Sequence, residues 1–118
     1  MADDCIFCKI LDGKLPSKRI AESPSCVAIE DKFPQAPVHA LVIPRKHVAS
    51  LHDANDEDQA LLGEMLLLAR KVAIAKGVHE RGYRVITNIG SDGGQAVAHI
   101  HLHVLGGKRL GPKLVSEG

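Results

Sequence analysis

The feature that most constrains the fold is a run in which histidine alternates with an aliphatic residue, His99-Ile100-His101-Leu102-His103-Val104. In a β-strand, residues two apart share a face. We therefore predict a strand over 99–105 with Ile100, Leu102 and Val104 facing a core and three imidazoles on the other side. The alternative is an ordinary solvent-exposed strand face that happens to carry histidines. Histidine is rare on such faces, and proton transfer and metal binding near neutral pH use it most often.

Two kinds of chemistry suit three adjacent imidazoles. Histidines at i and i+2 of a strand can share a metal ion. Alternatively, close imidazoles cannot all be protonated cheaply, so some stay neutral near neutral pH. A neutral imidazole whose Nδ1–H is bonded to a carbonyl presents a free Nε2 lone pair, which can attack phosphorus or accept a proton.

The loop before this strand favours phosphorus. The segment Gly90-Ser91-Asp92-Gly93-Gly94-Gln95 can turn sharply and offer bare backbone N–H groups, and such concavities bind anions. Taken alone it could equally be a plain turn. Its place just before three aligned histidines makes a phosphate site the better interpretation, although neither a P-loop nor a dinucleotide-binding motif occurs.

Length and charge exclude several classes of function. The 118 residues suffice for one domain, 1–118, and a net charge of +1 gives no field to hold nucleic acid or an anionic membrane. No apolar stretch approaches the ~20 residues that span a bilayer. The N-terminus lacks the features of a secretory signal and the three cysteines cannot all pair, so we predict a cytoplasmic protein.

The rest of the chain predicts strands around one long helix. We expect a short helix or turn over 5–11, a long helix over 57–76 ending before Gly77, and four further strands over 19–22, 26–30, 39–43 and 83–88. Hairpin-like spacing predicts an α+β fold with a mainly antiparallel sheet of five strands.

The histidine run also matches the triad pattern of the histidine triad (HIT) family. Similarity to its Hint branch, the histidine triad nucleotide-binding proteins, extends over nearly the whole chain. It includes Asp31, the segments 34–37, 42–44, 91–95 and 104–107, and the polar residues His39 and Asn88. The resemblance implies the HIT-like fold and a homodimer with the long helix and sheet edges at its interface.

The resemblance also implies a reaction. Proteins of this branch cleave purine nucleoside 5′-phosphoramidates at the α-phosphorus and release a nucleoside monophosphate of the AMP or GMP class. Carried over, His101 is the nucleophile that forms a nucleotidyl-histidine intermediate. His103 donates to a phosphate oxygen or the bridging atom, and His99 and His39 orient and polarise the group. No metal cofactor is then required for catalysis.

Nucleotide-binding residues carry over in the same way. Asn88 and the segment Gly94, Gln95, Ala96 and Val97 would hold the phosphate, Asp31 would accept from the ribose hydroxyls, and Ile6, Phe7, Ile10 and Ile29 would form the base slot. From the residues alone, His39 could be a satisfied histidine on an apolar strand. Asp31 could likewise be a turn residue, and the four apolar residues could be ordinary core.

Three departures from the family pattern bear on which substrate the protein would take. Lys32 stands where relatives often carry an apolar residue, Ala96 stands where many have a hydroxyl, and the tail 108–118 lacks tryptophan and differs from the Hint tail. The third triad position, His103 rather than Gln, favours the hydrolase side of the superfamily. A dinucleoside polyphosphate hydrolase and a nucleotide-binding or zinc-stabilised module with little turnover are the alternatives.

The cysteines raise a separate possibility. Cys5-x-x-Cys8 has the spacing of a pair of zinc ligands. The alternative is that these are two free cysteines on a short helix. The resemblance supplies two more ligands, His47 and His99, for a structural zinc site.

Overall fold

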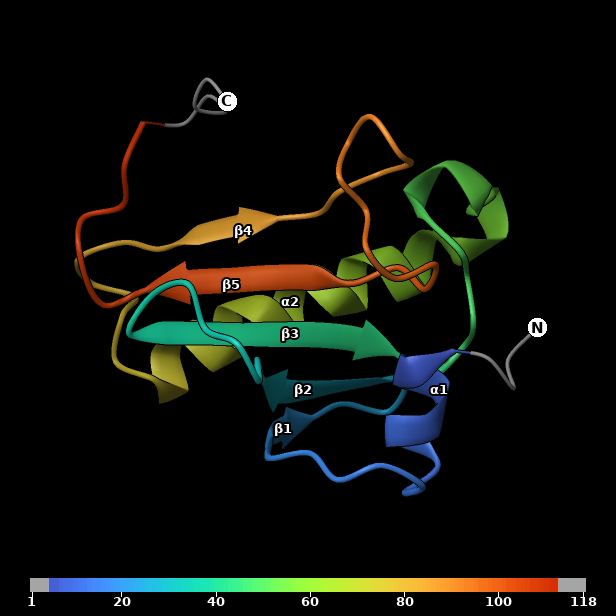
Figure 1. Cartoon of the computed structure of the whole chain (residues 1–118), viewed down its shortest axis with the longest axis horizontal. Coiled ribbons are helices and arrows are strands. Elements are labelled where there is room, and N and C mark those ends of the chain that lie inside the picture. The colour runs from blue at the N-terminus through green and yellow to red at the C-terminus, as the bar shows by residue number, and fades with distance from the viewer. Residues whose placement is uncertain (1–4, 113–118) are drawn as a thin grey trace.

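Residues 5–112 of the chain are described by a computed structural model, and they build one antiparallel sheet with two helices (Figure 1). The strand order is β1-β2-β3-β5-β4, and every neighbouring pair is antiparallel. The strands are β1 (Arg19–Glu22), β2 (Cys26–Glu30), β3 (Val38–Pro44), β4 (Arg84–Ile86) and β5 (Leu102–Gly106). The helices are α1 (Ile6–Leu11) and α2 (Gln59–Ala75). The predicted α+β fold, with a five-stranded antiparallel sheet, one long helix and a short N-terminal helix, is confirmed.

The alternation of side chains along β3 and β5 gives the sheet two different faces. One face packs on α2, which passes behind the sheet in Figure 1, and its buried side chains include Ala40, Val42, Leu102 and Val104. The other face carries Leu41 and Ile43 and packs on α1 through Phe7. As predicted, Ile100, Leu102 and Val104 join one core, and His101 and His103 are left on the side where α1 lies.

Local signals explain where the helices begin and end. Asn55 and Asp58 form a reciprocal capping box that starts a 3-10 turn, Asp56–Asp58, immediately before α2. Gly77 follows the end of α2 with φ of 73°, a conformation that costs glycine little. The predicted helix over 57–76 therefore begins as a 3-10 turn and continues as α2.

The predicted strand over 99–105 is wrong at its start, because the ladder begins only at Leu102. Leu102 pairs with Val42, and residues 99–101 do not continue the ladder although β3 runs on to Pro44. This segment is held instead by single bonds, such as that from the Ile100 N–H to the Val48 carbonyl (2.7 Å). The strand expected over 83–88 is likewise shorter, covering Arg84–Ile86.

Within residues 5–112 no helix is long and apolar enough to cross a membrane. Part of the divergent tail, residues 113–118, lies outside the described residues, as do residues 1–4.

Candidate active site

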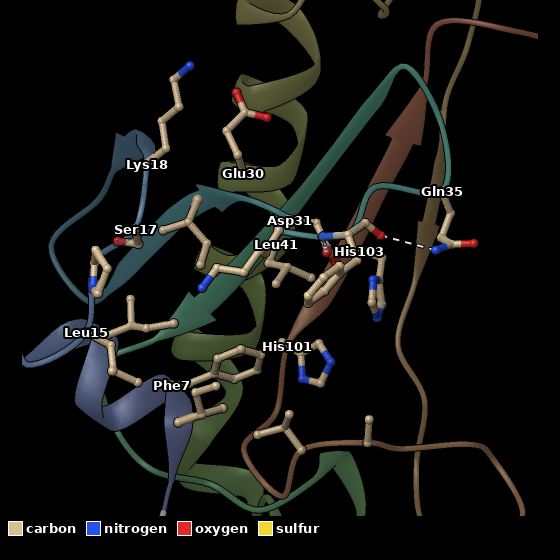
Figure 2. Close-up of a pocket in the computed structure, with 18 of the residues that line it drawn as sticks. Phe7, Leu15, Ser17, Lys18, Glu30, Asp31, Gln35, Leu41, His101 and His103 are labelled. Carbon is tan, nitrogen blue, oxygen red and sulfur yellow. Dashed lines mark hydrogen bonds between the residues drawn. The ribbon is translucent and has the colours of Figure 1, made fainter.

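A cavity of about 890 Å³ opens on the face of the sheet that carries α1 (Figure 2). His101 and His103 stand at one side of it, and apolar side chains from α1, β2 and β3 continue the lining from there. Of the predicted nucleotide-binding residues, those that line the cavity are Ile6, Phe7, Ile10, Ile29, Asp31, Asn88, Gly94, Ala96 and Val97. Phe7 and Ile29 belong to a core cluster and also line the cavity.

His101 is held in one tautomer. Its Nδ1 lies 2.8 Å from the backbone carbonyl oxygen of His99. A carbonyl can only accept, so Nδ1 carries the hydrogen and Nε2 of the neutral ring keeps its lone pair. Burial lowers the pKa of His101, although the bond to His99 and the charge of Asp31 oppose this shift. The ring is therefore neutral near neutral pH and presents a nucleophilic or basic nitrogen.

His103 is held in the opposite tautomer through His39. The backbone N–H of Gln35 donates to His39 Nδ1 (3.0 Å), so the hydrogen of a neutral His39 is on Nε2. That nitrogen lies 2.9 Å from His103 Nδ1 and 3.2 Å from an Asp31 oxygen. When His39 donates to it, His103 Nδ1 accepts, and the hydrogen of a neutral His103 is then on Nε2. Burial, with the neighbouring His101 and His39, lowers the pKa of His103 to about 4.

The register of the β3–β5 pair brings His39 and His103 together. Leu41 pairs with His103, so His39, two residues earlier on the same face, is the diagonal neighbour of His103 and within reach of a long side chain. The rings of His101 and His103 lie 5.1 Å apart at their centroids. The cavity thus has a nitrogen lone pair and an N–H donor on adjacent imidazoles.

The glycine-rich loop is organised by side chains that point into it. Asn88 Nδ2 donates to the Gly93 carbonyl (2.8 Å), and Gln95 Nε2 donates to the carbonyls of Ala49 (2.6 Å) and Val97 (2.9 Å). A Cβ at Gly93 would lie 2.2 Å from the Ile89 carbonyl oxygen, so only glycine fits there. The side-chain amide of Gln95, for which no role was predicted, therefore positions the loop, and Gln95 does not line the cavity.

The loop leaves few backbone donors for a ligand. The N–H groups of Gly94 and Gln95 already donate to the carbonyls of Ser91 and Gly90 (3.0 Å each). Within the described part of the chain, no carbonyl accepts from the N–H of Ala96 or Val97. Because Ala96 and Val97 also line the cavity, their N–H groups are available to a ligand there.

His99 differs from the other triad histidines, because its ring is fully buried and does not line the cavity. Its Nε2–H donates to the Pro44 carbonyl (2.8 Å), which leaves the Nδ1 lone pair directed at a cluster of cysteines and histidine. His99 therefore does not reach the cavity, and it could orient the reacting group only through its carbonyl, which accepts from His101 Nδ1. The reason is that residues 99–101 lie outside the strand and His99 turns toward α1.

The cluster contains Cys5, Cys8, His47 and His99, whose ligand atoms all lie within 4.8 Å of one another. From His99 Nδ1, the distances are 3.2 Å to Cys5 Sγ, 3.5 Å to Cys8 Sγ and 3.1 Å to His47 Nδ1. Ligand atoms around tetrahedral zinc are separated by about 3.3 to 3.8 Å, given bonds of about 2.0 to 2.3 Å. The four donors fit zinc in number, type and spacing.

A second group, Asp31, His39 and His103, is equally compact but chemically different. His39 Nδ1 already accepts from Gln35, so its Nε2 carries a hydrogen and is not available as a ligand. We therefore interpret this group as a hydrogen-bond relay. Asp31 also accepts from the Phe33 N–H (2.8 Å), so it serves the turn as well as the cavity.

Sequence reasoning missed part of the cavity wall. Leu41 could have been found, because it shares a face of β3 with His39. No sequence signal marks the segment Leu15–Lys18, which follows α1 and lines the far side of the cavity. The other lining residues that were missed are Glu30, Phe33 and Gln35.

Comparison with known proteins agrees with this geometry. The HIT domain model matches residues 12–110, and the chain belongs to the HIT domain family. An uncharacterised HIT-like protein of Synechococcus elongatus is 46% identical over 110 residues, covering 93% of this chain and 96% of the relative.

Two solved structures are also similar. A HIT family hydrolase from Legionella pneumophila is 48% identical with a TM-score of 0.87, covering 90% of this chain and 95% of that one. A HIT family hydrolase from Clostridium thermocellum is 43% identical with a TM-score of 0.92, covering 96% and 98%.

Proposed function

We propose that the protein is a nucleotide hydrolase that cleaves purine nucleoside 5′-phosphoramidates through a nucleotidyl-His101 intermediate and releases a nucleoside monophosphate. The observation that carries the proposal is the pair of neighbouring imidazoles in opposite tautomers at one side of an apolar cavity. The hydrolase relatives from Legionella pneumophila and Clostridium thermocellum support the reaction type.

The first step uses both imidazoles. His101 Nε2 attacks the α-phosphorus and forms a P–N bond, while the bond from phosphorus to the leaving amine breaks. The Nε2–H of His103 donates a hydrogen bond to the departing nitrogen, which takes a proton from solvent and leaves as the neutral amine. The attacking ring becomes an imidazolium, and its Nδ1–H remains bonded to the His99 carbonyl, which stabilises the developing charge.

In the second step water attacks the phosphorus and loses a proton to solvent, which balances the proton taken up in the first step. The bond to His101 breaks, and the nucleoside monophosphate leaves. The pKa of about 4 keeps His103 neutral at neutral pH, so it acts as a hydrogen-bond donor and not as a charged acid. The bond from His39 Nε2 to His103 Nδ1 keeps the hydrogen of the neutral ring on Nε2.

The cavity also supplies the binding contacts. The base would lie on the wall formed by Phe7, Ile10 and Ile29, and the N–H groups of Ala96 and Val97 would hold the phosphate. Each Asp31 oxygen has a lone pair beyond those used by Phe33 and His39, so it can accept from ribose hydroxyls. Ala96 supplies no hydroxyl, so the leaving group would receive its hydrogen bond from the Nε2–H of His103.

The test is to incubate the protein with an adenosine 5′-phosphoramidate and, separately, with a dinucleoside polyphosphate. We expect faster cleavage of the phosphoramidate and a loss of at least about a thousandfold in kcat for His101→Ala, because the nucleophile is removed. His52→Ala is the matched control, since His52 is exposed and has no assigned role.

Preferential cleavage of the polyphosphate would instead favour the dinucleoside polyphosphate hydrolase. If the protein binds nucleotides but cleaves neither compound, it is the low-turnover binding module. If His101→Ala leaves the cleavage rate unchanged, the covalent mechanism is wrong.

We also propose that Cys5, Cys8, His47 and His99 hold a structural zinc ion, with four protein ligands and no open position. Burial and the neighbouring Cys5 raise the pKa of the Cys8 thiol to about 11. A bound cation would offset this shift and favour the thiolate. A reducing cytoplasm, the predicted location, would keep both cysteines available as ligands.

Metal analysis of protein purified without added metal tests this proposal. We expect about one zinc per chain in the wild type and in Cys26→Ser, because Cys26 lies in the other core cluster. A zinc content far below one equivalent in the wild type would contradict the four-ligand site.

We further propose a homodimer that covers exposed apolar side chains of α2 and the edge strand β4. Leu66 and Leu67 of α2 are 57% and 58% exposed, and Val85 of β4 is also exposed. Burying such a patch is favourable because it removes apolar surface from water.

Sedimentation at micromolar concentration tests the dimer. We expect twice the chain mass for the wild type and a shift toward the monomer for Leu67→Glu, which would bury a charge. Leu51→Glu, at an exposed leucine outside these elements, should sediment like the wild type. A monomeric wild type would contradict the proposal.

A further inference from the structure

The Cys5/Cys8/His47/His99 cluster and the cavity share a wall. Phe7 lies between the two cysteines in the sequence and belongs to α1. Its ring lies edge-on to His99, with centroids 5.9 Å apart, and edge-on to His101, with centroids 4.9 Å apart. Figure 2 shows Phe7 beside His101 in the cavity. Any movement of the cysteine-bearing turn would therefore move a ring that packs on His101.

His99 provides a second and shorter connection. Its side chain contacts the cluster through Nδ1 and the Pro44 carbonyl through Nε2, and its own carbonyl accepts from His101 Nδ1. A single residue therefore joins the cluster to the hydrogen bond that sets the tautomer of His101.

The sheet does not hold this residue in place. The β5 ladder begins at Leu102, and the nearest backbone bond of the segment is that of Ile100 to Val48 (2.7 Å). The orientation of the His99 carbonyl thus depends on how firmly the buried His99 ring is fixed. One end of the ring is fixed by Pro44, and the other end faces the cysteines.

We propose that His99 and Phe7 are positioning residues, and that metal occupancy of the cluster fixes the tautomer and direction of His101. The expected fall in kcat rests on the proposed function, whereas the expected change in the His101 tautomer does not. With a metal bound, the His99 ring is fixed at both nitrogens and α1 is fixed through Cys5 and Cys8. Without it, one end of the His99 ring keeps only weak contacts to thiols and to His47.

A merely structural ion would have a different effect. It would raise the free energy of unfolding and leave the folded site unchanged, so metal-free but folded protein would keep its His101 geometry. A positioning cluster instead changes the active site of protein that is still folded. Partners that orient groups from outside the reacting centre typically contribute 10- to 100-fold.

The experiment compares His47→Gln and Cys8→Ser with the wild type and with Cys26→Ser. His47 is exposed, so its replacement removes a ligand without opening the core. Cys26→Ser is the matched control, because it alters a buried cysteine that belongs to the other core cluster. Zinc content, circular dichroism, the ¹⁵N shifts of the His101 ring and the kcat and KM for an adenosine 5′-phosphoramidate are measured for each protein.

For His47→Gln and Cys8→Ser we expect loss of zinc, a native circular dichroism spectrum and a mixture of His101 tautomers in place of one. The expected fall in kcat is on the order of 10- to 100-fold, whereas Cys26→Ser keeps its zinc and its single tautomer. If Cys8→Ser fails to fold, His47→Gln alone decides the matter.

A zinc-free, folded variant that keeps one His101 tautomer would overturn the proposal and leave the proposed function intact. If no variant cleaves the phosphoramidate, and the wild type also fails, the proposed function is wrong. The tautomer measurement then still decides whether the cluster positions His101.

Discussion

The hydrogen bond from His101 Nδ1 to the His99 carbonyl is the interaction on which the account of this protein depends. At 2.8 Å, to an acceptor that cannot donate, it assigns the ring hydrogen to Nδ1 and leaves Nε2 free to attack. The complementary bond, from Gln35 through His39 to His103, assigns the other hydrogen to His103 Nε2. Two identical side chains therefore acquire opposite roles from their partners, without any difference in their own chemistry.

The two faces of the sheet make this arrangement possible. Aliphatic residues of β3 and β5 pack against α2, and this rigid layer leaves the opposite face free for imidazoles and for α1. Burial then keeps His101 and His103 neutral, because a charged ring would lose its solvation. The near-zero net charge of the chain is consistent with this design, since phosphate would be bound by local amides and not by a basic surface.

Much of the fold could be predicted from the sequence, because the alternation of apolar and polar residues along a strand and the residues that form turns are local signals. The burial of Ile100, Leu102 and Val104 follows from a period of two, and Gly77 marks the end of α2. The direction of the His99 ring could not be predicted, because it depends on where the strand pairing of β3 ends. The inward-facing Gln95 amide was missed for a similar reason, since its acceptor Ala49 is 46 residues away in the sequence.

The most direct test of the account is the tautomeric state of the two imidazoles, read from the ¹⁵N shifts of the ring nitrogens at pH 7 and pH 5.5. We predict that His101 carries its hydrogen on Nδ1 and His103 on Nε2. His103 should remain neutral at both values, because its pKa is lowered to about 4. Finding the same tautomer in both rings, or a protonated His103 at pH 5.5, would contradict the account.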